Sequence, residues 1–230
     1  MTGAYWKVAG ILFAGAVIAA IAGQLAGVPW LVFIFKPLAT IFLTGLALAN
    51  WLARRERYAF WLTIGMLFSL LGDVLLLWPE RYFLPGLAAF LFTHIAYLLA
   101  LTRDAKFPAH ALVWLLYLAA GAGLCAILWP RLAAPLRFPV AIYALFVATM
   151  AAQAMGRFLV LRTPAARLAA LGAFLFLLSD ALLSFDRFYA PLAFSPLFIL
   201  GTYYLGQWLI VAGQIKIDST ARFPGQAALQ

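Results

Sequence analysis

Long apolar runs recur along the chain, and short connections containing charged residues and proline separate them. A membrane-spanning helix needs about 20 predominantly apolar residues, and each run is near that length. The pattern predicts an all-α membrane protein, a bundle of eight transmembrane helices. We expect residues 1–217 to form this single transmembrane domain and residues 218–230 to form a polar C-terminal tail. The predicted helices cover about Lys7–Leu25, Leu31–Trp51, Tyr58–Trp78, Phe83–Leu101, Ala109–Leu128, Leu136–Phe158, Arg167–Asp186 and Pro196–Ile217.

The composition also indicates a membrane protein. Of the 230 residues, 67% are hydrophobic and 10% are charged, whereas about a quarter of the residues of a soluble domain are charged. The first apolar run is long and further spans follow it, which does not fit a cleavable signal peptide. Because Cys125 is the only cysteine, the chain can form neither an intrachain disulfide nor a metal site built from several cysteines.

The net charge of +9 is explained by membrane topology. The basic residues are scattered through short connections, and no run is dense enough to follow a nucleic-acid backbone, so we expect no nucleic-acid partner. Lysine and arginine concentrate in cytoplasmic connections. With a cytoplasmic N-terminus, eleven basic residues lie on the inner side and four on the outer side, which predicts cytoplasmic N- and C-termini in the inner membrane. The inner residues are Lys7, Arg54, Arg55, Arg57, Arg103, Lys106, Arg157, Arg162, Arg167, Lys216 and Arg222, and the outer ones are Arg81, Arg131, Arg137 and Arg187.

Two stretches of the chain resemble each other. One begins at Gly72-Asp73 and the other at Ser179-Asp180, and each continues as Asp-x-Leu-Leu-x-aromatic, then an acid–arginine pair and another aromatic residue. They occur in the third and seventh predicted helices. An offset of four helices keeps both copies in the same orientation across the membrane, so we predict a parallel internal repeat of four plus four helices.

Lys36, Asp73 and Asp180 each lie within an apolar run, about five or six residues from its outer end. At about 1.5 Å per residue, this corresponds to a depth of roughly 8–9 Å. A charged side chain within the membrane costs about 2.5–3.5 kcal/mol on insertion scales and by default marks a functional site. Since charges on different helices can meet only at one level, we predict that the three side chains share a cavity open to the outer side. The structural alternative, an ion pair between Lys36 and one acid, leaves the other acid unexplained.

Two carboxylates and one ammonium in apolar surroundings suit acid–base chemistry. Charge repulsion would keep one acid protonated while the lysine holds the other ionised, which is the division that general acid–base catalysis needs. We therefore predict Asp73, Asp180 and Lys36 as catalytic residues, with no cofactor. A metal site is not expected, because His94 has no second histidine at a ligand spacing. Four polar residues near the same level are predicted to bind substrate, namely His94, Tyr203, Tyr204 and Gln207. His94 alone is also explained by packing.

Together these residues resemble the YhhN-like lysoplasmalogenase family. The resemblance covers nearly the whole chain and implies a multi-pass membrane hydrolase. Such an enzyme cleaves the vinyl ether bond of lysoplasmalogens and releases a fatty aldehyde and a glycerophospho-base, so its partners are a lyso-lipid substrate and membrane lipids. The matching motifs are Lys36-Pro37-Leu38, Gly72-Asp73, His94, Ser179-Asp180, and Tyr203-Tyr204 with Gln207.

Two other classes of protein share some of these features. Aspartate and lysine residues in membranes also relay protons, and a repeat with a site at its interface suits a transporter. Against a transporter, the predicted polar level lies near one membrane face, and the inner half of the bundle is mainly apolar. A scaffold protein, in which the buried charges only match one helix to another, is the third interpretation.

Overall fold

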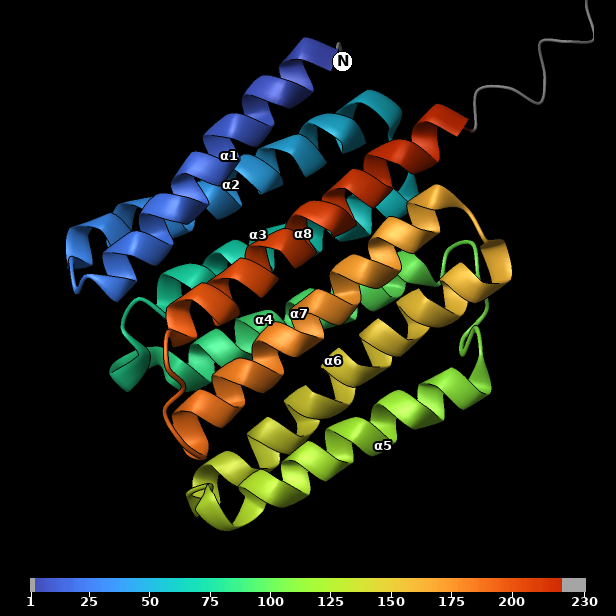
Figure 1. Ribbon diagram of the computed structural model, residues 1–230. Helices are drawn as coiled ribbons and strands as arrows, with labels where there is room; N and C mark the ends of the chain where they lie inside the picture. The colour runs from blue at the N-terminus through green and yellow to red at the C-terminus, as the bar shows by residue number, and fades with distance from the viewer. Residues whose placement is uncertain (1–2, 221–230) are drawn as a thin grey trace, which may run out of the picture.

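The helices begin and end close to the predicted positions. The computed structural model describes the backbone of residues 3–220 and the side chains of residues 8–215. Most of this described part is helical and none of it is a strand, and its eight α-helices are long and apolar enough to cross a membrane, which confirms the predicted class (Figure 1). The helices are α1 (Gly3–Leu25), α2 (Pro29–Arg54), α3 (Arg57–Leu75), α4 (Pro79–Leu101), α5 (Ala111–Leu128), the short 3-10 helix η1 (Trp129–Arg131), α6 (Ala134–Leu161), α7 (Pro164–Phe188) and α8 (Ser195–Thr220).

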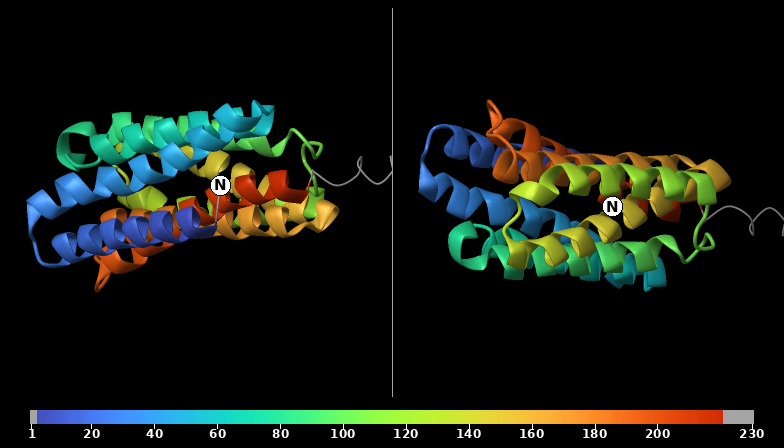
Figure 2. Two further views of the ribbon diagram at one scale, coloured as in Figure 1. Left: turned by 90° about the horizontal axis from the view of Figure 1, so that it is seen from above. Right: turned by 90° about the horizontal axis from the view of Figure 1, so that it is seen from below.

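The helices run along one common direction in two layers. Seen from above and below, α2, α3 and α4 form one layer, and α1, α8 and α7 form the other (Figure 2). α6 contacts both α4 and α7 and closes the bundle along one edge, with α5 packed on the outside of α6.

One end of the bundle, which we call the site end, is formed by residues 26–28, 76–78, 129–133 and 189–194. α1 begins and α8 ends at the opposite end of the bundle (Figure 1). Which end faces the cytoplasm, and whether the two halves form a parallel repeat, remain predictions. Of the predicted C-terminal tail, residues 221–230 lie outside the described residues, and α8 continues to Thr220.

Glycine residues bring α7 and α8 into direct backbone contact. A Cβ atom on Gly172 would lie 2.5 Å from the carbonyl oxygen of Gly206, and one on Gly206 would lie 2.8 Å from the carbonyl oxygen of Gly172. Small residues allow this close approach in membrane bundles, where dispersion contacts between helices replace the hydrophobic effect. The contact fixes the spacing between Asp180 on α7 and Tyr203 on α8.

α3 ends earlier than the sequence predicted. It ends at Leu75, not Trp78, and the N–H groups of Leu77 and Trp78 bond to carbonyls three residues back in a tight turn. Pro79 explains the difference, since a residue before proline is disfavoured in helical conformation and Trp78 is non-helical. Asp73 consequently lies two residues from the end of α3, nearer to the site end than expected.

Arg157 is not the surface charge that the topology count assumed. It lies in α6, its side chain is buried, and its guanidinium donates two hydrogen bonds to the Asp104 carboxylate. The neighbouring Gln153 accepts from the backbone N–H of Ala109 and donates to the carbonyl of Lys106. These contacts fix the connection between α4 and α5 at the end opposite the site.

Candidate functional site

A cavity of about 320 Å³ lies at the site end, and α1–α4 and α6–α8 contribute to its wall. The three charged residues that were predicted to meet, Lys36, Asp73 and Asp180, all line it. Leucine and phenylalanine side chains form much of the remaining wall. The other polar residues of the lining are Gln24, Tyr143, Ser179, Ser184, Asp186, Arg187, Ser195 and Tyr203.

Asp73 is held by donors from two other helices. The hydroxyl of Thr40 on α2 donates to its Oδ2 at 2.5 Å, and the hydroxyl of Tyr203 on α8 donates to the same oxygen at 2.7 Å. The Lys36 ammonium lies 3.6 Å from Oδ1. An ionised carboxylate only accepts hydrogen bonds, and each contact to Asp73 is of that kind.

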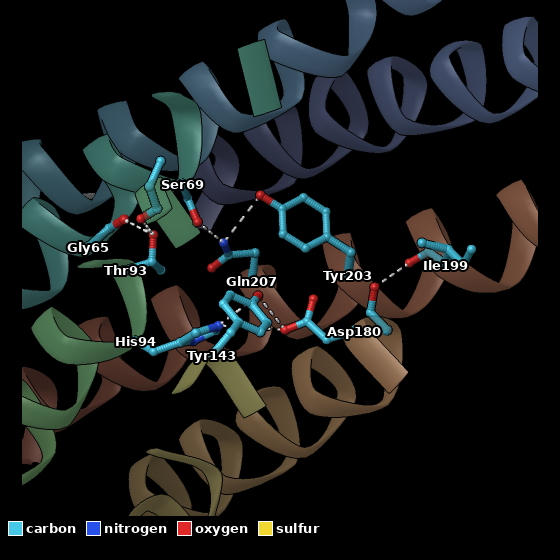
Figure 3. Close-up of polar contacts among 11 residues, drawn as sticks. Gly65, Ser69, Thr93, His94, Tyr143, Asp180, Ile199, Tyr203 and Gln207 are labelled. Atoms are coloured by element: carbon cyan, nitrogen blue, oxygen red, sulfur yellow. Dashed lines mark hydrogen bonds and ion pairs between the residues drawn. The ribbon is translucent and has the colours of Figure 1, made fainter. Parts of the chain in front are cut away.

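A buried hydrogen-bond network centred on the side-chain amide of Gln207 supports Tyr203, which donates to Asp73. Gln207 donates to the Ser69 hydroxyl at 2.6 Å and to the Tyr203 hydroxyl at 3.4 Å (Figure 3). Its own carbonyl accepts from Tyr97 at 2.7 Å. Tyr204 donates to the backbone carbonyl of Lys36 at 2.8 Å. α8 is thereby tied to α2, α3 and α4 at the level of Asp73.

Asp180 has different partners. The Tyr143 hydroxyl on α6 donates to its Oδ2 at 2.8 Å, and Nε2 of His94 lies 3.0 Å from that hydroxyl and 3.5 Å from the same carboxylate oxygen (Figure 3). Nδ1 of His94 is buried and has no hydrogen-bond partner among the described residues. These contacts fit a His94 ring that carries its proton on Nε2 and none on Nδ1. Tyr143 can then accept a hydrogen bond from His94 while it donates one to Asp180.

The two acids also differ in access to the cavity. The side chain of Asp73 is 2% exposed, whereas that of Asp180 is 14% exposed. The ring of Phe176 lies between the residues around Asp73 and those around Asp180. It packs edge-on against Tyr203, with ring centroids 5.3 Å apart, and against His94, with centroids 4.9 Å apart. One cavity therefore contains two carboxylates in different surroundings. Among the residues that the structure describes, no group of three His, Cys, Asp or Glu side chains could hold a metal ion.

Comparison with known proteins identifies the family. Residues 31–214, most of the chain, match the YhhN family. The chain belongs to the YhhN family. It is similar to the human protein named lysoplasmalogenase TMEM86A (33% identity over 161 residues, 66% of this chain and 64% of the relative) and to human lysoplasmalogenase TMEM86B (34% over 148 residues, 64% and 60%). It is also similar to a lysoplasmalogenase of Mycobacterium tuberculosis (32% over 187 residues, 78% and 68%).

This YhhN chain spans about 64% of the length of its human relative TMEM86A. No solved structure matches it.

The structure places the predicted substrate-binding residues of this YhhN protein in two groups. Tyr203 lines the cavity, whereas His94, Tyr204 and Gln207 are not among the lining residues. These three are buried and contact residues that do line it. That these three residues bind substrate stays a prediction. Their contacts indicate that they would act on the substrate through Tyr143, Lys36 and Tyr203.

Sequence reasoning missed Tyr143, which contacts both Asp180 and His94. A single tyrosine in an apolar span is usually a packing or interfacial residue. One signal was present in the sequence: Tyr143 is the only residue with a hydroxyl between Arg137 and Thr149 on α6.

Proposed function

We propose that this YhhN protein is an integral-membrane hydrolase that cleaves the vinyl ether bond of lysoplasmalogens. Lyso-lipid and water would give a fatty aldehyde and a glycerophospho-base. The observation that carries the proposal is a single cavity lined by Asp73 and Asp180, two carboxylates in different surroundings. The names of the human and mycobacterial relatives support the same reaction.

The reaction explains why two carboxylates are needed. A vinyl ether is hydrolysed by slow proton transfer to its β-carbon, which creates an oxocarbenium ion. Water adds to the α-carbon, and the resulting hemiacetal separates into aldehyde and alcohol. The catalyst therefore needs an acid near the β-carbon, a negative charge near the cation and a base for the water. One protonated and one ionised carboxylate supply all three.

In this proposal Asp180 donates the proton and Asp73 is the ionised carboxylate. Thr40 and Tyr203 donate hydrogen bonds to Asp73, and the ammonium of Lys36 faces it, as suits an anion. Asp180 is the more exposed of the two acids and can exchange protons with water in the cavity. The ammonium of Lys36 favours the ionised form of Asp73.

Protons balance over one cycle. Asp180 gives a proton to the β-carbon, and Asp73 takes a proton from the water that attacks the α-carbon. A water molecule in the cavity returns that proton from Asp73 to Asp180. The hemiacetal then breaks its bond to the glycerol oxygen, which leaves as the alcohol after receiving the hydroxyl proton.

The surrounding residues position these groups. Tyr143 and His94 orient the carboxyl group of Asp180. Gln207 holds the hydroxyl of Tyr203, and Tyr203 itself lines the cavity and can touch the substrate or the attacking water. Tyr204 fixes the backbone of α2 at Lys36.

The substrate would enter the cavity at the site end. Its alkenyl chain would lie against apolar side chains of the wall, among them Leu87, Val140 and Leu183. The distribution of basic residues supports a multi-pass protein of the inner membrane with cytoplasmic termini, which puts the site end at the outer face.

Purified protein in detergent tests this function. We expect the wild-type chain to release fatty aldehyde from a lysoplasmalogen, followed by mass spectrometry, and to release none from the matched lyso-lipid with a saturated ether. A panel of lyso-lipids with different head groups would then identify the preferred substrate. Failure to form aldehyde from every vinyl ether in the panel would contradict the proposal.

A transporter with a proton- or substrate-coupled Asp/Lys site is the competing function. The cavity lies at one end of the bundle, and the buried side chains of Met66 and Met150 belong to the packed hydrophobic core. This arrangement favours a hydrolase. Uptake of a lyso-lipid into liposomes without any product would favour the transporter.

A further inference from the structure

Arg187 is a second cation of the cavity lining, in the last turn of α7. Its guanidinium lies over the ring of Phe83, 4.5 Å from the ring centroid. Among the described residues, no carboxylate forms an ion pair with it, whereas Lys36 already faces Asp73. The adjacent Asp186 accepts a hydrogen bond from the backbone N–H of Leu192. Arg187 is therefore free to bind an anion that enters the cavity.

The position of Arg187 relative to Asp180 is set by the helix. The two residues are seven apart in α7, so they lie on one face, and Arg187 is roughly 10 Å farther along the axis. Ser184 lies between them on the same face and also lines the cavity. This face of α7 thus carries an acid, a hydroxyl and a guanidinium in a row towards the site end.

The spacing matches a lyso-lipid with a phosphodiester head group. Six bonds separate the α-carbon of the vinyl ether from the phosphorus atom, which is roughly 7 Å for an extended chain at about 1.2 Å per bond. A guanidinium binds a phosphate oxygen at about 2.8 Å. When the ether lies beside Asp180, the sum of these two lengths matches the distance along the helix axis from Asp180 to Arg187.

We propose that Arg187 binds the phosphodiester of the substrate and thereby places the vinyl ether between Asp180 and Asp73. This inference rests on the proposed function and adds the residue that recognises the substrate's phosphate group and so favours the phospholipid over a neutral alkenylglycerol. Arginine suits the task because its planar guanidinium can donate two parallel hydrogen bonds to phosphate. The ring of Phe83 holds the guanidinium over the cavity.

The test compares two substrates with the same alkenyl chain, one with a phosphocholine head group and one a neutral alkenylglycerol. We expect Arg187→Gln to lower the ratio of kcat/KM for the phospholipid over that for the alkenylglycerol by roughly ten- to hundredfold, and Arg187→Lys to lower it less. Arg131→Gln is the matched control, since Arg131 stacks on Tyr189 at 3.8 Å but is not part of the cavity lining. An unchanged ratio in Arg187→Gln would overturn the inference.

A binding measurement separates this inference from the proposed reaction. A lysophospholipid with a saturated ether keeps the phosphate but has no vinyl group, so its affinity can be measured by tryptophan fluorescence without turnover. Weaker binding by Arg187→Gln, roughly ten- to hundredfold, would support the inference even if the wild type formed no aldehyde. Equal affinity of the variant and the wild type would overturn it. Competition by inorganic phosphate as strong as that by the lipid would show a general anion site and would also overturn it.

Discussion

The hydroxyl of Tyr203 lies 2.7 Å from Oδ2 of Asp73, although the two residues are 130 positions apart in the chain. The ring of Tyr203 packs edge-on against Phe90 and Phe176 and also lines the cavity. One side chain thus joins α8 to the carboxylate of α3 and faces the space where substrate would bind. Its two parts have separate roles, because the ring supports packing and the hydroxyl orients a carboxylate.

Tyr203→Phe separates these two roles. The variant keeps the ring in its aromatic surroundings and removes one hydrogen bond to a charged group, so we expect kcat to fall about ten- to hundredfold with little loss of stability. Aldehyde release and thermal unfolding in detergent measure the two effects. Tyr117→Phe is the control, because Tyr117 on α5 does not line the cavity. Wild-type kcat in Tyr203→Phe would show that the hydroxyl does not act on Asp73.

Removing either carboxylate should slow turnover strongly. We expect Asp73→Asn and Asp180→Asn each to lower kcat by roughly 10²–10⁴-fold, the usual contribution of general acid–base catalysis. Aldehyde release by purified protein measures the loss. Glu80→Gln removes an exposed acid from the site end, outside the cavity lining, and should retain activity.

The two variants should differ in stability. Asp73→Asn leaves the Lys36 ammonium and two hydroxyls without their charged acceptor, so we expect a loss of roughly 1–3 kcal/mol. Asp180 is more exposed, and its replacement should cost less. Full activity in either variant would remove that acid from the mechanism.

The fold was predictable because length and apolar composition alone determine a membrane-spanning helix. The end of α3 was not, because the tight turn at residues 76–78 depends on Pro79 and on local hydrogen bonds that continue past the helix. Lys36, Asp73 and Asp180 could be identified because an ionisable residue is rare in an apolar run. Their common cavity followed from their similar depths.

Other parts of the site carried no comparable signal. Tyr143 looks like an ordinary aromatic residue of a span, and only the approach of α6 to α7 brings it to Asp180. Depth alone also could not show that Lys36 faces Asp73 while Asp180 has Tyr143 as its partner. These pairings depend on the rotation of each helix about its own axis. Packing determines that rotation, and the sequence alone does not show it.

The contact between α7 and α8 gives a further prediction. In Gly206→Ala the new Cβ atom would meet the carbonyl oxygen of Gly172, so the two helices must separate. We expect a loss of roughly 1–3 kcal/mol in stability and a lower kcat, because α7 carries Asp180 and α8 carries Tyr203. Thermal unfolding and aldehyde release test both. The control is Gly201→Ala, where the Cβ atom would meet no atom within 4 Å; an equal loss there would assign the effect to glycine itself.

The ion pair at the opposite end should affect stability without affecting chemistry. Asp104→Asn leaves the buried guanidinium of Arg157 without its carboxylate. Because Asp104 is 40% exposed and solvent screens the pair, we expect a loss of about 1–2 kcal/mol rather than the larger value of a fully buried pair. Thermal unfolding measures this loss. A changed kcat in folded protein would show that the two ends of the bundle are coupled.

The proposed proton transfer to carbon leaves a permanent mark on the product. If Asp180 protonates the β-carbon, a reaction in heavy water should place one deuterium on the carbon next to the aldehyde group, which mass spectrometry detects as an increase of one mass unit. The same step should slow kcat in heavy water, since the transferred proton comes from an exchangeable carboxyl group. Unlabelled aldehyde incubated with the protein in heavy water controls for later exchange. An aldehyde without deuterium would mean that the ether bond breaks by a route that never protonates the β-carbon, and Asp180 would then need a different role.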